Sequence, residues 1–452
     1  MNLIIDGGIV VSDKIIKDGA VVVEDNRIVA VGSSTELKSR YSGYERIDAE
    51  GCAVLPGLIN THTHAAMSLL RGYAEGLPLS KWLNEKIWPV EAHLKPRDIQ
   101  LGAELAAYES LLFGCTTLNS MYFYYDEGNE LQAFEKVGIR ATVGHTFFEK
   151  TWEEGLKMTE QVVVKWHGKD NGRLRVSVCP HAPYSTGPTA YENTIRIANW
   201  LSVMYGRQYK IIIHTHAAES KDECAETSKA FNVDTKEGII SYMARRGFIS
   251  PDTLIAHAIH LTDTDVELLK KYETKVSFNP VSNLKLGVGV PNAVALPEQG
   301  ITVSLGTDGP ASNNTLDMFE TMKVISLLMK GLFFDPTLVP SINIFKYATE
   351  NGGIALGYND LGAIRPGYLA DMILLDLKVP HAKPLYNIYD HLVFSARSSD
   401  VKTAIVNGRI VMENRQFPNV KLDRLLEEVE KAKEELFLRI EDSSASGKGK
   451  EA

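Results

Sequence analysis

Two histidines in the pattern His62-Thr63-His64 are the first residues whose types and spacing predict chemistry. They follow an apolar run of about strand length, residues 53–59. Side chains two positions apart on a strand point the same way, so both imidazoles present nitrogen ligands on one side. Such a pair suits a transition metal. It also occurs as two structural histidines, and the metal interpretation therefore depends on further ligands elsewhere in the chain.

Further polar residues occur at the ends of later strand-like runs. His216 in the run 210–219 is followed by Glu219, His257 lies within the run 253–261, and Asp308 ends the run 301–309. A carboxylate at Asp308 supplies a hard fourth ligand and a proton acceptor. The set predicts one divalent metal per chain, with Zn²⁺ expected and Fe²⁺ as the alternative. Bound zinc lowers the pKa of its water to about 7.

The remaining histidines are interpreted as structural. His214 lies two residues before His216 and is expected to be packed or to support a ligand from behind, although the sequence leaves the reverse assignment open. His260 is expected to point outward or to lie in a loop. Helical or loop surroundings predict ordinary surface or structural roles for His93, His167, His381 and His391.

The positioning elements are eight strand-like runs separated mostly by amphipathic stretches, which predict an α/β fold of the (β/α)8 TIM-barrel type. In such barrels the chemistry lies at the carboxyl ends of the strands, where these polar residues fall. Hairpin-like strands at both chain ends predict a small β-sandwich domain. The expected division is 1–57 and 366–420 for the two parts of the sandwich, 58–365 for the barrel, and 421–452 for a helix with a flexible tail.

Composition narrows the function classes. The 452 residues carry a net charge of −9, with 44% hydrophobic and 23% charged residues, which is typical of a globular protein and argues against nucleic-acid binding. No apolar run is long enough to span a membrane, and the start of the chain does not resemble a signal peptide. The four cysteines form no CxxC pair, which favours a cytoplasmic location. We expect a homo-oligomer, a dimer or a tetramer.

Several segments of the chain resemble the motifs of a known protein family. The segments PGLINTHTH, HTHAAES, AHAIH and SLGTDGPASNN resemble the metal motifs of the amidohydrolase superfamily. The longer stretches HTHAAMSLLRGYAEGLPLSKWL, IWPVE, SFNPVSNLKLGVGVP and GTDGPASNNTLDMFETM are similar to the methylthioadenosine/S-adenosylhomocysteine deaminase family. The resemblance covers nearly the whole chain. It implies hydrolytic deamination of 5′-methylthioadenosine, S-adenosylhomocysteine, adenosine or 5′-deoxyadenosine to the inosine analogue and ammonia.

The resemblance also implies a role for each site residue. The implied metal ligands are His62, His64, His216 and Asp308. Glu219 matches the glutamate that transfers protons, and His257 matches the histidine that orients the attacking hydroxide, with Asp308 as the third catalytic group. The implied substrate contacts are Glu91 to the ribose hydroxyls, Trp82 as an aromatic wall of the pocket, and His181, together with Glu219 and Asp308.

The sequence departs from the family pattern after the third strand. Members that use S-adenosylhomocysteine place two arginines there to bind its carboxylate, whereas this chain has His145 at the first position and no evident counterpart at the second. A histidine binds a carboxylate weakly and only when protonated. We therefore expect His145 to contact the substrate but to favour methylthioadenosine, adenosine or 5′-deoxyadenosine over S-adenosylhomocysteine.

Three alternatives differ in how well the sequence fits them. A sibling aminohydrolase acting on guanine, cytosine or a triazine remains open. A cyclic-amide hydrolase needs a carboxylated lysine on the fourth strand, and the run 174–183 contains none. A non-catalytic scaffold is expected to have lost metal ligands, and here the full set is present.

Overall fold

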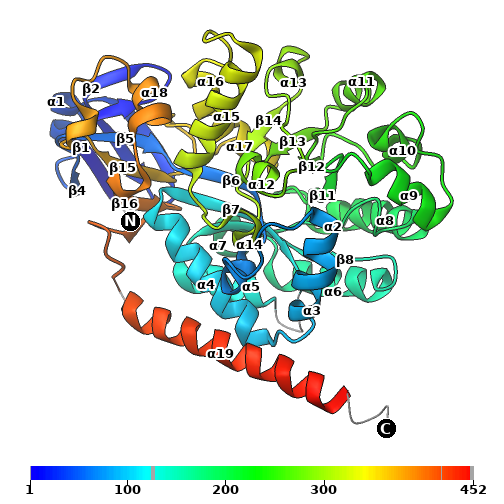
Figure 1. The fold of residues 1–452 in the computed structure, drawn as a ribbon. Helices are drawn as coiled ribbons and strands as arrows, with labels where there is room; N and C mark the ends of the chain where they lie inside the picture. The colour runs from blue at the N-terminus through cyan, green and yellow to red at the C-terminus, as the bar shows by residue number, and fades with distance from the viewer. Residues whose placement is uncertain (1, 124–127, 419, 448–452) are drawn as a thin grey trace.

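A computed structural model describes residues 2–123, 128–418 and 420–447 of the chain. Parallel strands with helices around them form one part, and a sheet built from both ends of the chain lies beside it (Figure 1). The C-terminal helix runs along the outside of the parallel-strand part. None of the helices in the described ranges combines the length and apolar character needed to cross a bilayer.

The parallel strands follow the order of the predicted runs, and the fourth run is divided into two short strands. One sheet has the order β10-β8-β7-β6 with β9 paired to β8, and the other has the order β11-β12-β13-β14. Every recorded pair within these sheets is parallel. The strands are β6 (Leu58–Thr63), β7 (Cys115–Tyr122), β8 (Arg140–Phe147), β9 (Leu174–Val176), β10 (Cys179–Pro180), β11 (Ile213–Ala217), β12 (Thr253–His257), β13 (Lys275–Phe278) and β14 (Val303–Leu305).

The two sheets meet without forming one closed ladder, so the continuous barrel expected from the sequence is not observed. An isolated bridge between Val178 and Ile213 joins them on one side. On the other side β14 is only three residues long, and one backbone hydrogen bond, from the Asp308 N–H to the His62 carbonyl at 2.9 Å, is supplemented by side chains of β6. The Thr61 hydroxyl donates to the Leu305 carbonyl at 2.9 Å, and the Asn60 amide oxygen accepts from the Thr307 backbone N–H at 3.0 Å.

Helices separate the strands and cover their outer face (Figure 1). Several begin with recognisable caps. The Thr262 hydroxyl accepts from the Asp265 N–H at 3.1 Å at the start of α11, and the Asp317 carboxylate accepts from two backbone N–H groups at the start of α15. The helices are α1 (Ser34–Arg40), η1 (Ala65–Leu70), α2 (Leu79–Lys81), η2 (Trp82–Ile87), α3 (Trp88–Glu91), α4 (Pro96–Leu112), α5 (Asn129–Val137), α6 (Trp152–Trp166), α7 (Lys169–Gly172), α8 (Pro188–Tyr205), α9 (Glu223–Phe231), α10 (Ile239–Arg245), α11 (Asp263–Lys271), α12 (Pro280–Lys285), α13 (Ala295–Glu298), α14 (Pro310–Asn313), α15 (Met318–Phe333), α16 (Ser341–Tyr347), α17 (Glu350–Ala355), η3 (Pro380–Ala382), α18 (Ile388–Asp390), η4 (His391–Ser395), η5 (Ser398–Asp400) and α19 (Leu422–Gly447).

Strands from the two chain ends share one eight-stranded sheet of order β17-β16-β15-β5-β1-β2-β3, with β4 paired to β1. The antiparallel pair β5–β15 joins the two ends. The predicted two-layered sandwich is not confirmed, because these strands hydrogen-bond into a single sheet. Its strands are β1 (Asn2–Val11), β2 (Ile15–Glu24), β3 (Arg27–Ser33), β4 (Glu45–Asp48), β5 (Cys52–Pro56), β15 (Met372–Asp376), β16 (Val401–Val406) and β17 (Arg409–Met412). The domain boundaries at 57, 365 and 420 stay predictions.

A buried ion pair links the mixed sheet to the parallel strands. The Arg140 guanidinium at the start of β8 donates to both carboxylate oxygens of Asp371, at 2.6 and 2.9 Å. Both side chains are excluded from solvent. The backbone N–H of Asn407 also donates to Asp371, at 2.8 Å. Because this carboxylate neutralises a cation deep in the protein, loss of either partner leaves an uncompensated charge.

The predicted C-terminal helix is present as α19, which packs on α4. Arg439 donates to Asp98 at the start of α4, and Arg97 pairs with Glu428 at 2.7 Å. The final residues of the predicted flexible tail, 448–452, lie outside the described residues.

Candidate metal centre and substrate pocket

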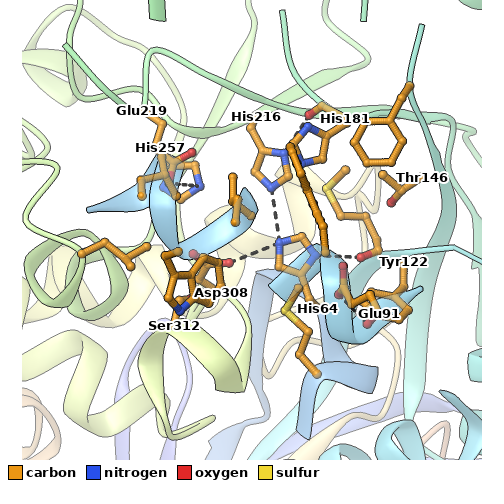
Figure 2. Close-up of a pocket in the computed structure, with 18 of the residues that line it drawn as sticks. His64, Glu91, Tyr122, Thr146, His181, His216, Glu219, His257, Asp308 and Ser312 are labelled. Atoms are coloured by element: carbon orange, nitrogen blue, oxygen red, sulfur yellow. Dashed lines mark hydrogen bonds and ion pairs between the residues drawn. The ribbon is translucent and has the colours of Figure 1, made fainter. Parts of the chain in front are cut away.

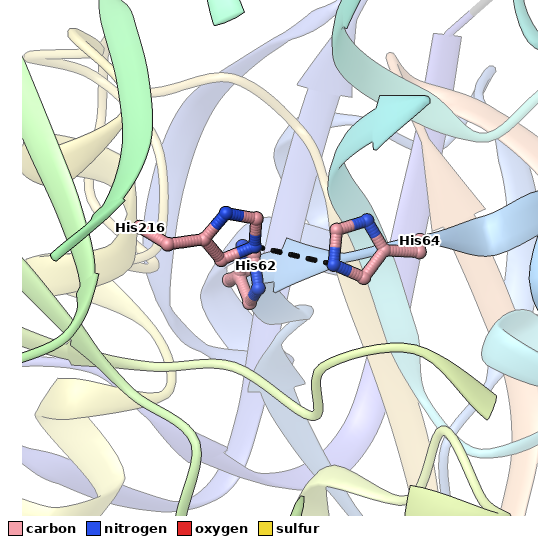
Figure 3. A group of neighbouring side chains, drawn as sticks. All are labelled: His62, His64 and His216. Atoms are coloured by element: carbon pink, nitrogen blue, oxygen red, sulfur yellow. Dashed lines mark hydrogen bonds between the residues drawn. The ribbon is translucent and has the colours of Figure 1, made fainter. Parts of the chain in front are cut away.

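Four side chains from three separate strand ends converge at the carboxyl end of the parallel strands. His62 is on β6, His64 follows it directly, His216 is on β11 and Asp308 follows β14. The Nε2 atoms of His64 and His216 are 3.3 Å apart (Figure 3). Asp308 Oδ1 is 3.3 Å from the Nε2 atoms of both His62 and His64. The structure therefore brings together all four predicted metal ligands.

The spacing of these atoms fits a divalent cation. Ligands at about 2.0–2.1 Å from zinc in a tetrahedron are separated by about 3.3–3.4 Å, which matches the observed distances. His62 Nε2 is also a buried nitrogen without a hydrogen-bond partner among the described residues, as expected for an atom whose lone pair serves a metal. Burial lowers the pKa of His62 to about 4, so its imidazole is neutral at pH 7. The donor set fits the metal that the sequence predicts.

Contacts behind the three imidazoles fix their orientation. His64 Nδ1 lies 2.8 Å from the Met121 carbonyl, and His216 Nδ1 lies 2.7 Å from the His181 carbonyl. A carbonyl can only accept, so these Nδ1 atoms donate and leave each Nε2 lone pair facing the centre. His62 Nδ1 instead faces another ring, with His214 Nε2 at 2.9 Å. His214, predicted to be packed or supporting, is buried behind the ligands.

The backbone and neighbours of Asp308 hold its carboxylate in place. The Ser282 hydroxyl donates to Oδ2 at 2.6 Å and the Gly309 N–H donates to Oδ1 at 2.7 Å. Burial acts to raise the pKa of Asp308, but the contacts with His62 and His64 outweigh it and hold that pKa well below its usual range. Asp308 has a φ of 65°, a strained conformation that is common at functional sites.

His257 and Glu219 lie beside the ligand cluster on the neighbouring strand ends. His257 Nδ1 is 2.8 Å from the Asn283 amide oxygen, and Nε2 is 3.6 Å from Glu219 Oε1 (Figure 2). Donation to Asn283 leaves the Nε2 lone pair of His257 pointing into the site. Burial raises the pKa of Glu219, so its carboxyl holds a proton at a higher pH than an exposed glutamate does.

A narrow cavity of about 60 Å³ opens over the cluster and joins a wider outer cavity of about 890 Å³. The two spaces are continuous because they share lining residues, among them Trp88, Phe148, Tyr184 and Glu219. Aromatic and aliphatic side chains form most of the inner wall, with polar groups concentrated near the ligands. A small, largely apolar space with a few convergent polar groups is typical of a small-molecule site.

Five of the six predicted substrate residues line the inner cavity: Trp82, Glu91, His181, Glu219 and Asp308 (Figure 2 labels all of these except Trp82). Glu91 accepts a hydrogen bond from the Tyr122 hydroxyl at 2.5 Å, and burial raises its pKa to about 7. His181 Nδ1 lies 2.7 Å from the Ser185 hydroxyl, and burial lowers its pKa to about 3. A neutral His181 therefore offers a hydrogen bond to the cavity without a charge.

His145 is placed differently from the prediction. Among the described residues it lines neither the inner nor the outer cavity, whereas its neighbour Thr146 lines the inner cavity. Successive side chains on a strand face opposite sides, so only one of these two positions on β8 can face the substrate. Thr146 is therefore the one of the two that lines the inner cavity, and a contact between His145 and the substrate stays a prediction. Burial also lowers the pKa of His145 to about 4, which leaves it uncharged at pH 7.

Apart from Trp82, the aromatic side chains that form the pocket wall were not predicted from the sequence. Trp88, Tyr122, Phe148 and Tyr184 line the inner cavity together with Trp82. Trp88 lies in the same WPVE segment as Glu91, so that segment carried a usable signal. Phe148 and Tyr184 follow strand ends in loops, where no periodic pattern marks the side that a residue faces.

The other histidines lie outside the ligand cluster. His260 is exposed and lies 2.7 Å from the Val288 carbonyl, as expected for an outward-facing residue. His167 lies between Tyr209 and Val176, and His381 contacts Asp400. None of the histidines at 93, 167, 381 and 391 belongs to a potential metal-binding group among the described residues.

Comparison with known proteins places the chain among enzymes. Residues 53–411 match the amidohydrolase family, and a short match to an imidazolonepropionase-like composite domain of bacteria covers residues 19–41. A 5′-deoxyadenosine deaminase of Methanosarcina mazei is 39% identical over 94% of this chain and 95% of its own length. A 5-methylthioadenosine/S-adenosylhomocysteine deaminase of Syntrophomonas wolfei is 38% identical over 90% of this chain and 91% of its own.

A solved structure agrees with these sequence relatives. An adenosine deaminase from Xanthomonas campestris with bound zinc superposes with a TM-score of 0.88 at 28% identity, and the match covers 97% of this chain and 99% of that one. The family match extends over most of the chain and includes every residue of the ligand cluster. The chain therefore belongs to the amidohydrolase family.

Proposed function

We propose that this chain is a metal-dependent hydrolase that deaminates adenine nucleosides to the inosine analogue and ammonia. The observation that carries the proposal is the convergence of four potential metal donors with Glu219 and His257 beside a cavity lined by aromatic side chains, with Glu91 also in its wall. Relatives that span nearly the whole chain are named as deaminases of 5′-deoxyadenosine and of methylthioadenosine and S-adenosylhomocysteine.

In this proposal the metal would be held by His62, His64, His216 and Asp308, and Zn²⁺ is proposed over Fe²⁺ because imidazole nitrogens with one carboxylate are a donor set that zinc commonly takes. When bound, such a cation acts as a Lewis acid and lowers the pKa of water to about 7, so that hydroxide is available at neutral pH. Ser282 and the carbonyls behind His64 and His216 keep three of the four donors oriented, and His214 contacts the fourth, His62.

Glu219 and His257 act at the start of the reaction, His257 by orienting the hydroxide and Glu219 by transferring a proton. His257 accepts a hydrogen bond from the attacking hydroxide through Nε2, because its Nδ1 is engaged by Asn283. As the hydroxide oxygen bonds to C6 of the adenine ring, Glu219 delivers a proton to the adjacent ring nitrogen N1. Burial raises the pKa of Glu219, which favours the protonated form that this step requires.

Asp308 completes the reaction. Its carboxylate accepts the remaining proton of the added hydroxyl and passes it to the amino nitrogen on C6. The C6–N bond then breaks and the nitrogen leaves as ammonia, while C6 keeps the oxygen as a carbonyl. The hydrogen bonds from Ser282 and Gly309 hold the carboxylate in position for this transfer.

Glu91 and the aromatic walls position the nucleoside. We propose that Glu91 accepts hydrogen bonds from the ribose hydroxyls and that Trp82 and Trp88 pack against the rings. His181, held by Ser185, donates or accepts one further hydrogen bond as a neutral imidazole. A ribose contact gives Glu91 a function that a free base such as guanine or cytosine would leave unused.

The outer cavity is the proposed place for the 5′-substituent. Among the described residues its lining includes Lys150, Lys221 and Lys229 but no arginine. A lysine lacks the planar fork that binds a carboxylate through two parallel hydrogen bonds. We therefore propose that 5′-deoxyadenosine and methylthioadenosine, which carry no carboxylate, are better substrates than S-adenosylhomocysteine.

A panel of substrates scored for ammonia release tests the proposal. The panel contains 5′-deoxyadenosine, methylthioadenosine, adenosine, S-adenosylhomocysteine, guanine, cytosine and a triazine, assayed with wild type and with Glu91→Gln. We expect nucleosides to be deaminated and Glu91→Gln to raise KM for them more than it lowers kcat. Turnover confined to guanine, cytosine or the triazine would replace this proposal with the sibling activity. A dimer or tetramer stays a prediction, measurable by light scattering on the same preparation.

A further inference from the structure

A second cavity, of about 770 Å³, lies at the opposite end of the parallel strands from the metal ligands. Arg175 on β9 and Lys210, just before β11, line it from the parallel strands. The β2–β3 turn around Asp25 and the turn after β16 at Asn407 line it from the mixed sheet. The reaction proposed above has no use for this space, and the inference below does not depend on that reaction.

Arg175 is the unusual residue of this cavity. Only 5% of it is exposed, and its guanidinium lies 3.4 Å from the centre of the Tyr358 ring. Its recorded hydrogen bond is a 3.3 Å contact with the Gly357 carbonyl, and Nε is buried with no hydrogen-bond partner among the described residues. No carboxylate in the described ranges lies within ion-pair distance of it. A guanidinium has five N–H donors, and buried charges are normally paired, so this one lacks a counter-charge.

Further cations surround Arg175. Five basic side chains line the cavity, against the two carboxylates of Asp25 and Asp360. Asp360 is already paired with Arg27 at 2.8 Å. Arg207 is exposed and has no ion pair within the described part of the chain. Lys210 is likewise paired with Asp252 at 2.9 Å, and Arg409 is paired with Asp170 at 3.4 Å. Among the described residues, the cations of the cavity wall that have no ion pair are therefore Arg175 and Arg207.

We propose that this cavity binds a phosphate group, either as free phosphate or as the phosphomonoester of a small molecule. Arg175 and Arg207 supply charge-assisted hydrogen bonds to the phosphate oxygens, which is the geometry for which arginine is best suited. The cavity is larger than one phosphate requires, and Asn26, Asn171 and Gln208 in its wall offer polar contacts to the rest of such a molecule. Because the cavity lies at the far end of the strands, the bound phosphate is separate from the metal centre.

Calorimetric titration at constant ionic strength tests this site. The titrants are inorganic phosphate, ribose 5-phosphate and ribose, each added to the metal-loaded protein and to the chelator-treated protein. We expect both phosphates to bind in both preparations, with ribose 5-phosphate the tighter of the two, and ribose not to bind. Equal affinity of the two phosphates identifies free phosphate as the ligand. Binding that disappears on metal removal assigns phosphate to the metal centre and overturns the proposal.

Two single substitutions with the same change in charge locate the binding. Arg207→Ala removes a charge-assisted hydrogen bond and should weaken phosphate binding roughly tenfold or more. Arg196→Ala is the matched control, because Arg196 is exposed on α8 and contacts Asn193 at 2.9 Å, outside the cavity lining. Arg175→Met should abolish binding, with circular dichroism to verify folding. Absence of binding by wild type, or equal weakening by Arg207→Ala and Arg196→Ala, refutes the site.

Discussion

Replacing His214 with leucine measures how strongly the metal ligands depend on the side chain behind them. His214 is buried, with Nε2 at 2.9 Å from His62 Nδ1 and Nδ1 at 3.1 Å from the Asn119 amide nitrogen. Leucine is of similar size but has no polar atom. His62 Nδ1 therefore loses its recorded partner, whereas Asn119 keeps its 2.7 Å hydrogen bond to the Thr61 carbonyl.

Two effects follow from that loss, and both have known magnitudes. Removing the outer partner of a metal-binding histidine typically weakens metal affinity by about 10–100-fold, which corresponds to about 1.4–2.7 kcal/mol. Leaving a buried polar atom unpaired costs about 1–3 kcal/mol of folding free energy. We expect His214→Leu to raise the metal dissociation constant by that factor and to lower the free energy of unfolding of the metal-free protein by about 1–3 kcal/mol.

The assay is competition for Zn²⁺ with a chromogenic chelator, followed by urea unfolding of the metal-free protein. His214 does not line the substrate cavity in the described residues, so kcat should return close to wild type when metal is in excess. His260→Leu is the control, because His260 is exposed and outside the cluster. If His214→Leu binds zinc within twofold of wild type, His62 needs no support from this side and the reasoning fails.

Three further outcomes are expected. The Glu219→Gln variant should still contain its metal, measured by elemental analysis. Its kcat should fall by about 10²–10⁴-fold, because glutamine cannot transfer a proton. A kcat near that of wild type would show that Glu219 does not have this role. Asp371→Ala should lower the free energy of unfolding, measured in urea, by about 3–5 kcal/mol, because it leaves Arg140 buried and unpaired. The control is Glu237→Ala, which breaks the exposed pair with Arg245 and should lower it by less than about 1 kcal/mol. Burial raises the pKa of Glu223 from 4.5 to about 8, so the folded state binds more protons than the unfolded state between those values and stability falls as the pH rises through that window. Glutamine at position 223 cannot ionise, so Glu223→Gln should remove this pH dependence, which is at most about 1.4 kcal/mol per pH unit. The measurement is the free energy of unfolding in urea from pH 5 to 8. If its slope against pH is the same in the variant and in wild type, the assignment to Glu223 is wrong.

The sequence by itself determined the order of the strands and the residues at their ends. Alternation along a strand puts His62 and His64 on one side, and successive strand–helix units bring the carboxyl ends of parallel strands to the same face. Both arguments use only local periodicity and chain order. They pointed to Asp308 and to either His214 or His216, and the family resemblance selected His216. In the structure, His216 and Asp308 each have a ligand atom 3.3 Å from His64 Nε2.

Only the tertiary structure decided which neighbouring side chains share the cavity. His145 and Thr146 are adjacent and both polar, and the register of β8 against its neighbours directs Thr146 into the pocket. The open seam between β14 and β6, bridged by the Asn60 and Thr61 side chains, likewise depends on contacts across more than 240 residues. The unpaired charge of Arg175 becomes visible only when every potential partner has a position. Local sequence patterns constrain the face of a strand or helix, whereas the partners across that face are set by packing between distant segments.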